Sequence, residues 1–211
     1  MRTLISLFEK RGFKGILPVC LTALLMVLSQ LTSWGWLVLV AYVPLIWATQ
    51  EASPKQVFKL VCWATTLQYT ATLYWLTIAM SVFGHLSWVL SGIALVFLAM
   101  LIACYLAIAL ALARYLSLKL SFSYVWLFPV AICAAEYLRN YGFIGAFPWG
   151  MSGNSLASVP ILMQGASVVG AYGLVFGIGL VNILPFLCKK GFRGDLLVIA
   201  ALALILLWPL Q

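Results

Sequence analysis

Charged residues are scarce in this sequence. Only 8% of its 211 residues are Asp, Glu, Lys or Arg, whereas a soluble globular domain carries roughly a quarter. Hydrophobic residues make up 65% of the chain, and the mean hydropathy is +1.14. These values exclude a soluble domain. They predict an all-α, polytopic membrane protein that forms one transmembrane domain over residues 1–211.

Acidic residues, histidine and paired cysteines are rarer still. The chain has four acidic residues, one histidine (His85) and five cysteines without a CxxC spacing. An aspartyl dyad is excluded because Asp195 is the one aspartate, and proton-coupled transport has Glu136 as its only carboxylate within a span. One histidine and scattered cysteines give no metal-binding pattern. We therefore expect no metal and no cofactor.

The net charge of +8 does not indicate nucleic-acid binding, because the basic residues are distributed over short loops. Cytoplasmic loops of membrane proteins carry the excess of Lys and Arg. With the N-terminus inside, eleven of the twelve basic residues fall on the inner side and only Arg139 falls outside. This segregation predicts a cytoplasmic N-terminus and a periplasmic C-terminus at Gln211.

About seven apolar segments approach the length of roughly 20 residues that a membrane-spanning helix needs. A short interfacial helix is expected before them, in the basic stretch 1–15, which sets the apolar Leu4, Ile5, Leu7 and Phe8 against the basic Arg2, Lys10 and Arg11. The expected spans are Ile16–Leu31, Trp34–Ala48, Val57–Met80, Leu86–Ala113, Phe122–Tyr141, Ile161–Leu187 and Leu196–Leu210.

The segment between the fifth and sixth spans differs from the rest of the chain. Residues 142–160 are rich in Gly, Pro and Ser and are expected to form a periplasmic loop. Irregular backbone near a bilayer is tolerated where protein or a watery cavity covers it. We therefore expect the functional site at this outer-face loop.

Glu136 and Arg139 precede the loop and lie three residues apart, so they share one face of a helix. Ionisable residues at membrane depth are costly and mark functional sites. The pair could simply neutralise itself and fix the loop, or it could act on a ligand. An arginine fork suits a lipid phosphate.

Phe147, Pro148 and Trp149 form the centre of the loop. Pro148 restricts Phe147 to extended conformations, and tryptophan favours the headgroup level of a bilayer. An interfacial anchor is one interpretation of these residues. A wall for an acyl chain or a headgroup is the other.

Gly150-Met151-Ser152-Gly153 is a GxSG motif, as found around the serine of rhomboid-type intramembrane proteases. A serine nucleophile needs a base within hydrogen-bond reach. The base in rhomboids lies on a later helix, whereas His85 precedes the serine here. The order therefore argues against this mechanism, and His85 is expected in a loop on the outer side.

The run E-Y-L-R at 136–139, then G-A-F-P-W at 145–149, Gly153 and Ser155, resembles the bacterial apolipoprotein N-acyltransferase family. The continuation through Gln164-Gly165-Ala166, G-A-Y-G-L at 170–174, Phe176 and Asn182 is similar to the family's following helix. Upstream, Tyr74-Trp75 and Phe83-Gly84 look like its third and fourth spans. Ala146, Asn154 and Val175 depart from the family pattern.

The resemblance implies a role in the bacterial inner membrane, in lipid and lipoprotein handling for N-acylation. The family's chemistry lies in a nitrilase-like domain with a Glu-Lys-Cys triad, which follows the spans. The sequence ends at Gln211 without such a triad, so it is expected to correspond to a truncated, membrane-domain form that is inactive alone.

The expected contacts to phospholipid, and to a diacylglyceryl lipoprotein, are Glu136, Arg139, Phe147, Pro148, Trp149, Tyr74, Trp75 and His85. Three alternatives stay open. The chain is one half of an acyltransferase with a separate nitrilase-like subunit, or a non-enzymatic lipid-binding or assembly protein, or a rhomboid-like enzyme using Ser152 and His85.

Overall fold

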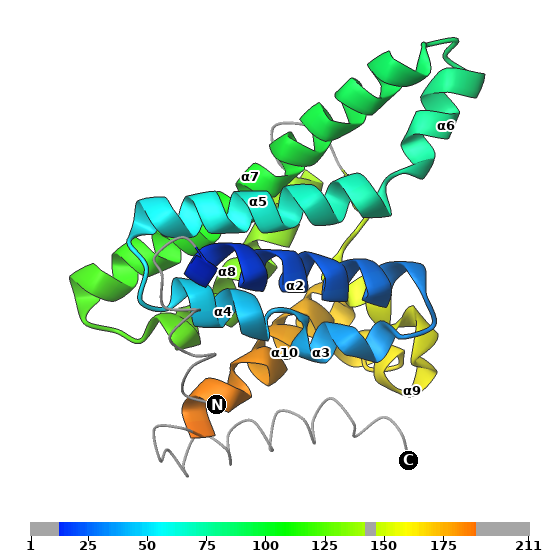
Figure 1. Ribbon diagram of the computed structural model, residues 1–211. Helices are drawn as coiled ribbons and strands as arrows, with labels where there is room; N and C mark the ends of the chain where they lie inside the picture. The colour runs from blue at the N-terminus through cyan, green and yellow to red at the C-terminus, as the bar shows by residue number, and fades with distance from the viewer. Residues whose placement is uncertain (1–12, 142–146, 189–211) are drawn as a thin grey trace, which may run out of the picture.

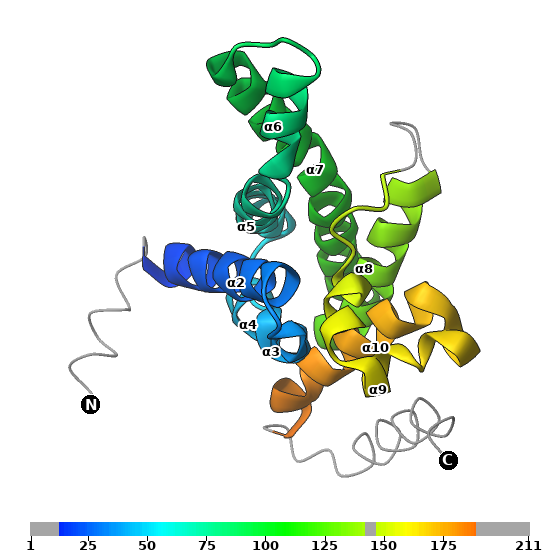
Figure 2. The same ribbon diagram turned by 90° about the vertical axis from the view of Figure 1, so that its right-hand side faces the viewer.

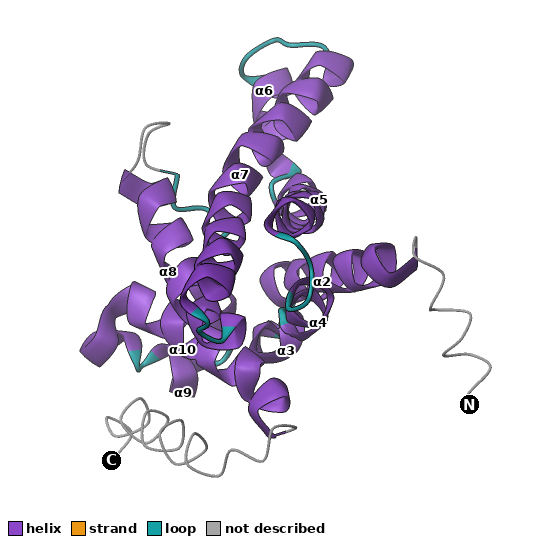
Figure 3. Cartoon of the chain, turned by 90° about the vertical axis from the view of Figure 1, so that its left-hand side faces the viewer, coloured by secondary structure: helices purple, strands orange, loops and turns teal. Residues whose placement is uncertain are grey.

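The computed structural model describes residues 13–141 and 147–188, and of these the side chains of 15–141 and 147–187. All regular elements in these ranges are helical, as Figure 3 shows. The all-α prediction is therefore confirmed for this part of the chain. The elements are α2 (Phe13–Leu31), η1 (Gly35–Leu37), α3 (Val38–Ala41), α4 (Val43–Thr49), α5 (Pro54–Thr72), α6 (Trp75–Val82), α7 (Trp88–Leu120), α8 (Tyr124–Tyr141), η2 (Ser152–Ser158), α9 (Pro160–Met163) and α10 (Ala166–Cys188).

Within the described residues, two helices, Trp88–Leu120 and Ala166–Leu187, are long and apolar enough to cross a membrane. Gly15–Leu31 and Gly35–Thr49 are shorter apolar helices. In Figure 1, α2, α5 and α8 run from left to right, whereas the α3–α4 pair, α7 and α10 return from right to left. The seven-span count remains a prediction. The interfacial helix at 1–15 and the seventh span at 196–210 fall largely or wholly outside the described residues.

The expected second span is a broken helix. Pro44 is the second residue of α4, where its missing N–H costs nothing. The helix is interrupted between Val38 and Tyr42, and the side-chain amide of Asn182 on α10 bonds to the backbone on both sides of the interruption. The Asn182 Nδ2 donates to the Val38 carbonyl at 2.9 Å, and its Oδ1 accepts from the Tyr42 N–H at 2.8 Å. One buried amide thus replaces a backbone hydrogen bond and joins α10 to this span.

Replacing Asn182 with alanine is expected to lower the free energy of unfolding by about 3 kcal/mol. It leaves the buried N–H of Tyr42 and the carbonyl of Val38 unpaired, at roughly 1–3 kcal/mol each. Unfolding in mixed detergent micelles, followed by circular dichroism, measures the change. Asn154→Ala is the control, because the Asn154 side chain is exposed and has no hydrogen bond in the structure. Equal stability of the two variants would contradict the bridging role of Asn182.

The third expected span, Val57–Met80, is wrong as a single helix. The structure divides it into α5 and α6, with Leu73 and Tyr74 at the break. α5 begins at a capping box formed by Ser53 and Gln56. At its other end the Thr72 hydroxyl donates to the carbonyl of Gln68, a local bond that bends helices.

α7 has 33 residues and is therefore roughly 50 Å long. Its first half forms a hairpin with α6 that projects away from the other helices (Figure 1). α6 has no buried residue, and Phe83 and Val89 beside the hairpin turn are 82% and 74% exposed. The hairpin of α6 and the first half of α7 therefore exposes a long apolar surface, as expected for a chain that lies in lipid.

The main core lies where α2, α4, α5, α7, α8 and α10 meet. Phe128 of α8 is fully buried, and the ring of Tyr42 meets its edge at 5.6 Å between centroids. α8 and α10 approach closely at Gly179, where a Cβ atom would lie 2.7 Å from the Cα of Pro129. Gly179 is therefore a point of close packing between α10 and α8. The core positions α8, which carries Glu136 and Arg139.

Four of the five basic residues whose side chains the structure describes gather at one end of the bundle. Lys55 and Lys59 lie in the first turns of α5, and Arg114 and Lys119 lie in the last turns of α7, which share the left side of Figure 1. Arg139 lies in the last turn of α8, which runs away from that side. This arrangement agrees with the segregation in the sequence. The orientation relative to the two sides of a membrane remains a prediction.

Candidate functional site

The loop after α8 folds back into the bundle. Residues 142–146 fall outside the described residues, and from Phe147 the chain descends beside α8 to η2 and α9 (Figure 2). Met151, Ser152 and Gly153 are buried, although they belong to a loop. The second half of the segment expected as a loop is a 3₁₀ helix packed against α2, η1 and α10. Its position on the outer face remains a prediction.

Glu136 fixes this loop from α8. Its Oε1 accepts two hydrogen bonds from Ser152, one from the backbone N–H at 3.0 Å and one from the hydroxyl at 2.6 Å. Ser152 is fully buried and Glu136 is 6% exposed. Hydrogen bonds to a carboxylate are short and roughly twice as strong as neutral ones. The serine of the GxSG motif is thus a donor that holds the loop in place.

Arg139 lies one turn further along α8 and binds a different partner. Its Nη1 donates to the hydroxyl of Tyr69 on α5, and the guanidinium carbon lies 5.4 Å from the centroid of that ring. Glu136 and Arg139 share the buried face of α8, as predicted, but they form no direct ion pair in the structure. Arg139 is 2% exposed, and its Nε and Nη2 have no hydrogen-bond partner in the structure. The guanidinium therefore keeps donors for a further acceptor.

Four more hydrogen bonds hold the loop, η1 and the end of α8 in place. Gln30 Nε2 donates to the carbonyl of Gly150 at 3.3 Å, and the hydroxyls of Ser29 and Ser155 lie 3.1 Å apart. The N–H of Gly35 donates to Ser158 Oγ at 3.0 Å, and Asn140 donates to the hydroxyl of Tyr172 at 2.9 Å. Apart from Gly150 of the GxSG motif and Ser155 and Tyr172 of the family pattern, these residues and Tyr69 were not predicted from the sequence. Their signal was a polar side chain inside an apolar run.

Phe147, Trp149 and Trp75 form an aromatic group at the surface of this loop. The ring centroids of Trp149 and Trp75 are 5.9 Å apart, and those of Trp149 and Phe147 are 5.2 Å apart, all edge-to-face. Phe147 also packs against the small buried cluster of α5 and α7 around Leu95 and Ala99. Trp149 is 52% exposed. The aromatic group is thus anchored to α5 and α7 through Phe147, whereas the ring of Trp149 stays half exposed.

Beside Trp75 and Trp149 lies a cavity of about 240 Å³. Its walls come from the end of α2, the end of α5 and the loop. They are Gln30, Leu31, Thr72, Leu73, Trp75, Trp149, Gly150, Met151, Asn154 and Ser155. We call this the aromatic cavity. Tyr74 lies at the break between α5 and α6, directly before Trp75, and is 54% exposed. Pro148 is exposed directly before Trp149.

The structure separates the predicted residues into three places. Phe147, Trp149 and Trp75 meet at the aromatic cavity, and Glu136 and Arg139 lie buried behind the loop. His85 lies in the α6–α7 connection, at the tip of the projecting hairpin. Ser152 therefore bonds to a carboxylate and has no histidine beside it in the described part of the chain. In that same part, no three His, Cys, Asp or Glu residues gather as metal ligands.

Residues 22–184 match the sequence model of the family described as the apolipoprotein N-acyltransferase N-terminal domain. The match covers more than half of the sequence and includes the ends of α2 and α5 beside the aromatic cavity, the loop and α10 as far as Leu184. The chain belongs to the apolipoprotein N-acyltransferase family. The resemblance seen in the block from Glu136 to Asn182 is thereby confirmed.

Curated relatives support the same assignment. The chain is similar to the apolipoprotein N-acyltransferase of Geobacter metallireducens, with 32% identity over 160 residues, which are 74% of this chain and 29% of that protein. The enzyme of the same name from Verminephrobacter eiseniae is 30% identical over 178 residues, 77% of this chain and 31% of the relative. The apolipoprotein N-acyltransferase of Nitrosomonas europaea is 34% identical over 110 residues, which are 50% of this chain and 21% of that protein. The alignments thus span about a third or less of these relatives' lengths.

Proposed function

We propose that this N-terminal domain handles lipid for the N-acylation of lipoproteins in the bacterial inner membrane. The aromatic cavity takes part of the phospholipid donor or of the diacylglyceryl lipoprotein. The observation that carries this proposal is the half-exposed pair Trp75 and Trp149, held at the mouth of a cavity by a loop with a buried polar anchor. Aromatic rings with one free face are suited to headgroups and to the first methylenes of an acyl chain.

Arg139 has a second role in this proposal. Its two nitrogens without a hydrogen-bond partner, Nε and Nη2, match a phosphate, which an arginine fork binds with two parallel hydrogen bonds. Because Arg139 is 2% exposed behind the loop, a headgroup reaches it only when the loop moves outward. In the closed position of the loop, Arg139 holds the side chain of Tyr69. The ring of Tyr69 in turn packs against the loop at Gly150, where a Cβ atom would lie only 2.9 Å from the ring.

Trp149→Ala is expected to weaken phospholipid binding about tenfold, since truncation of a central aromatic residue in a binding site costs on the order of 1–2 kcal/mol or more. The measurement is retention of a photoactivatable phospholipid by the purified chain. Trp34→Ala is the matched control, because Trp34 is 56% exposed but lies outside the aromatic cavity. If both variants retain lipid like the unchanged chain, the cavity is not the lipid site.

Arg139→Gln separates the two roles of the arginine. Weaker binding with an unchanged melting temperature assigns Arg139 to the headgroup. A lower melting temperature with unchanged binding to the folded fraction assigns it to the loop alone and removes it from the lipid site.

The acyl transfer itself is proposed to need a nitrilase-like domain, with its Glu-Lys-Cys triad. The test is to express residues 1–211 in a bacterium depleted of its own N-acyltransferase, with and without that domain as a separate chain. Lipoprotein N-acylation is followed by mass spectrometry. Acylation only with the added domain supports the proposal, and acylation by residues 1–211 alone overturns it. If the inserted, folded chain supports none in either case, the second candidate, a non-enzymatic lipid-binding protein, is favoured by its intact aromatic cavity.

A further inference from the structure

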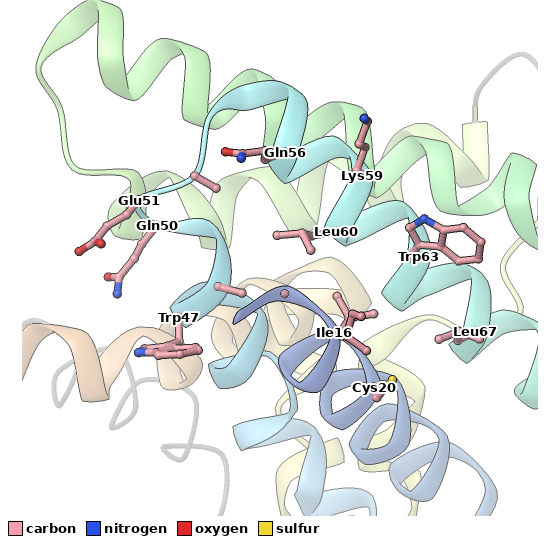
Figure 4. A pocket seen from close by; sticks show the side chains of 14 residues that line it. Ile16, Cys20, Trp47, Gln50, Glu51, Gln56, Lys59, Leu60, Trp63 and Leu67 are labelled. Carbon is pink, nitrogen blue, oxygen red and sulfur yellow. The ribbon is translucent and has the colours of Figure 1, made fainter. Parts of the chain in front are cut away.

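A second and larger cavity lies at the basic end of the bundle, far from the loop in the chain. It measures about 790 Å³, within the size range of ligand sites. Figure 4 shows it between α2, the end of α4 and the first half of α5. We call it the basic-end groove. Its lining includes Ile16 and Cys20 of α2, Trp47 of α4, and Lys59, Trp63 and Leu67 of α5.

The α5 wall of the groove changes from polar to apolar along one face. Lys59, Trp63 and Leu67 follow each other at four-residue spacing, so they form one stripe about 12 Å long. Trp63 is 66% exposed, and Ile16 opposite it on α2 is 63% exposed. Figure 4 shows Trp63 and Leu67 at one end and the polar side chains at the other. This gradient matches a lipid that lies along the helix.

Lys59 is the cation of the groove, and no carboxylate pairs with it in the described part of the chain. Lys55 lies one turn before it on α5. Glu51 also lines the rim, next to Gln50, and Figure 4 shows Gln56 between Glu51 and Lys59. The groove thus offers one free ammonium group beside amides, with a single carboxylate further along the rim. This pattern favours an anionic headgroup placed at Lys59.

We propose that the basic-end groove binds one anionic phospholipid of the leaflet on that side, with its phosphate on Lys59 and one acyl chain along Trp63 and Leu67. This site lies at the end of α5 opposite to Trp75 and the aromatic cavity, so it is separate from the lipid handling proposed above. An anionic leaflet attracts each nearby Lys or Arg, and burial of methylenes supplies the remaining affinity.

The experiment is native mass spectrometry of the full chain in mild detergent, titrated with phosphatidylglycerol or with zwitterionic phosphatidylethanolamine. Lys59→Gln is expected to weaken phosphatidylglycerol binding about fivefold and to affect phosphatidylethanolamine less. Glu51→Gln is expected to strengthen phosphatidylglycerol binding. Ala48→Trp fills the groove beside Trp47 and is expected to weaken both lipids. Lys119→Gln, at the same end but outside the groove, is the control and leaves binding unchanged.

The proposal is overturned if Lys59→Gln and Ala48→Trp bind phosphatidylglycerol like the unchanged chain, or if Lys119→Gln weakens it as much as Lys59→Gln. A dimer that Ala48→Trp dissociates would show a second copy in the groove instead of lipid. Stronger lipid binding after removal of residues 1–12 would assign the groove to that segment. Glu51→Gln changes an exposed side chain, so its expected gain tests the charge argument even if Ala48→Trp does not fold.

Discussion

Replacing Glu136 with alanine is expected to lower the free energy of unfolding by about 3 kcal/mol and to release the loop at Ser152. The substitution removes the acceptor of two hydrogen bonds, one of them 2.6 Å long, and leaves a buried N–H and a buried hydroxyl unpaired. It also leaves the buried guanidinium of Arg139 without a carboxylate one turn away. Both effects act in the same direction.

A double-mutant cycle isolates the contact itself. Ser152→Ala alone removes the hydroxyl bond, but in the Glu136→Ala background it removes only an unpaired hydroxyl. The two substitutions should therefore show a coupling energy of about 2 kcal/mol, measured as unfolding in mixed micelles. Ser53→Ala, at the N-cap of α5, shares no partner with Glu136 and should be additive with it. Additivity of Ser152→Ala with Glu136→Ala would contradict the anchoring role of the carboxylate.

Gly35→Ala is expected to destabilise the protein by about 3 kcal/mol or more, the upper range for overpacking of a close contact. A Cβ atom on Gly35 would lie 1.8 Å from the carbonyl oxygen of Ser155 and 2.2 Å from Ser158 Oγ. Backbone cannot yield as a flexible side chain can, so η1 and η2 must separate. The hydrogen bond from the Gly35 N–H to Ser158 is then lost as well. A melting curve of the purified variant measures the loss.

Gly92→Ala is the matched control for this substitution. Gly92 lies within α7, and a Cβ atom there would have no neighbour within 4 Å. Alanine is the better helix former, so this variant should be more stable than the unchanged chain by roughly 0.5–1 kcal/mol. Similar melting temperatures for Gly35→Ala and Gly92→Ala would mean that η1 and η2 do not pack as the structure shows.

Much of the site was predictable because its residues differ in type from the apolar helices around them. Glu136 and Arg139 stood out as charges inside an apolar run, and Phe147, Pro148 and Trp149 as irregular backbone between helices. The edge-to-face contacts of Trp149 with Trp75 and with Phe147 bring together three of the predicted residues. His85 did not join them, because its position in the α6–α7 connection depends on how far that hairpin projects.

The partners of the charged residues were not predictable. The spacing of three residues left two interpretations open for Glu136 and Arg139: a pair that neutralises itself and fixes the loop, or a pair that acts on a ligand. The structure pairs Glu136 with Ser152 and Arg139 with Tyr69, from segments 16 and 70 residues away. Spacing along one helix determines a shared face, but hydrogen-bond partners depend on which other segments pack against that face.

The sequence by itself determined the helical class, the positions of most helices, the gathering of basic residues at one end and the family. Each of these follows from local composition or from short motifs. Only the tertiary structure decided where helices break and what fills the breaks. The α5–α6 break and the Asn182 amide between Val38 and Tyr42 arise because buried backbone groups must find partners, which distant segments supply.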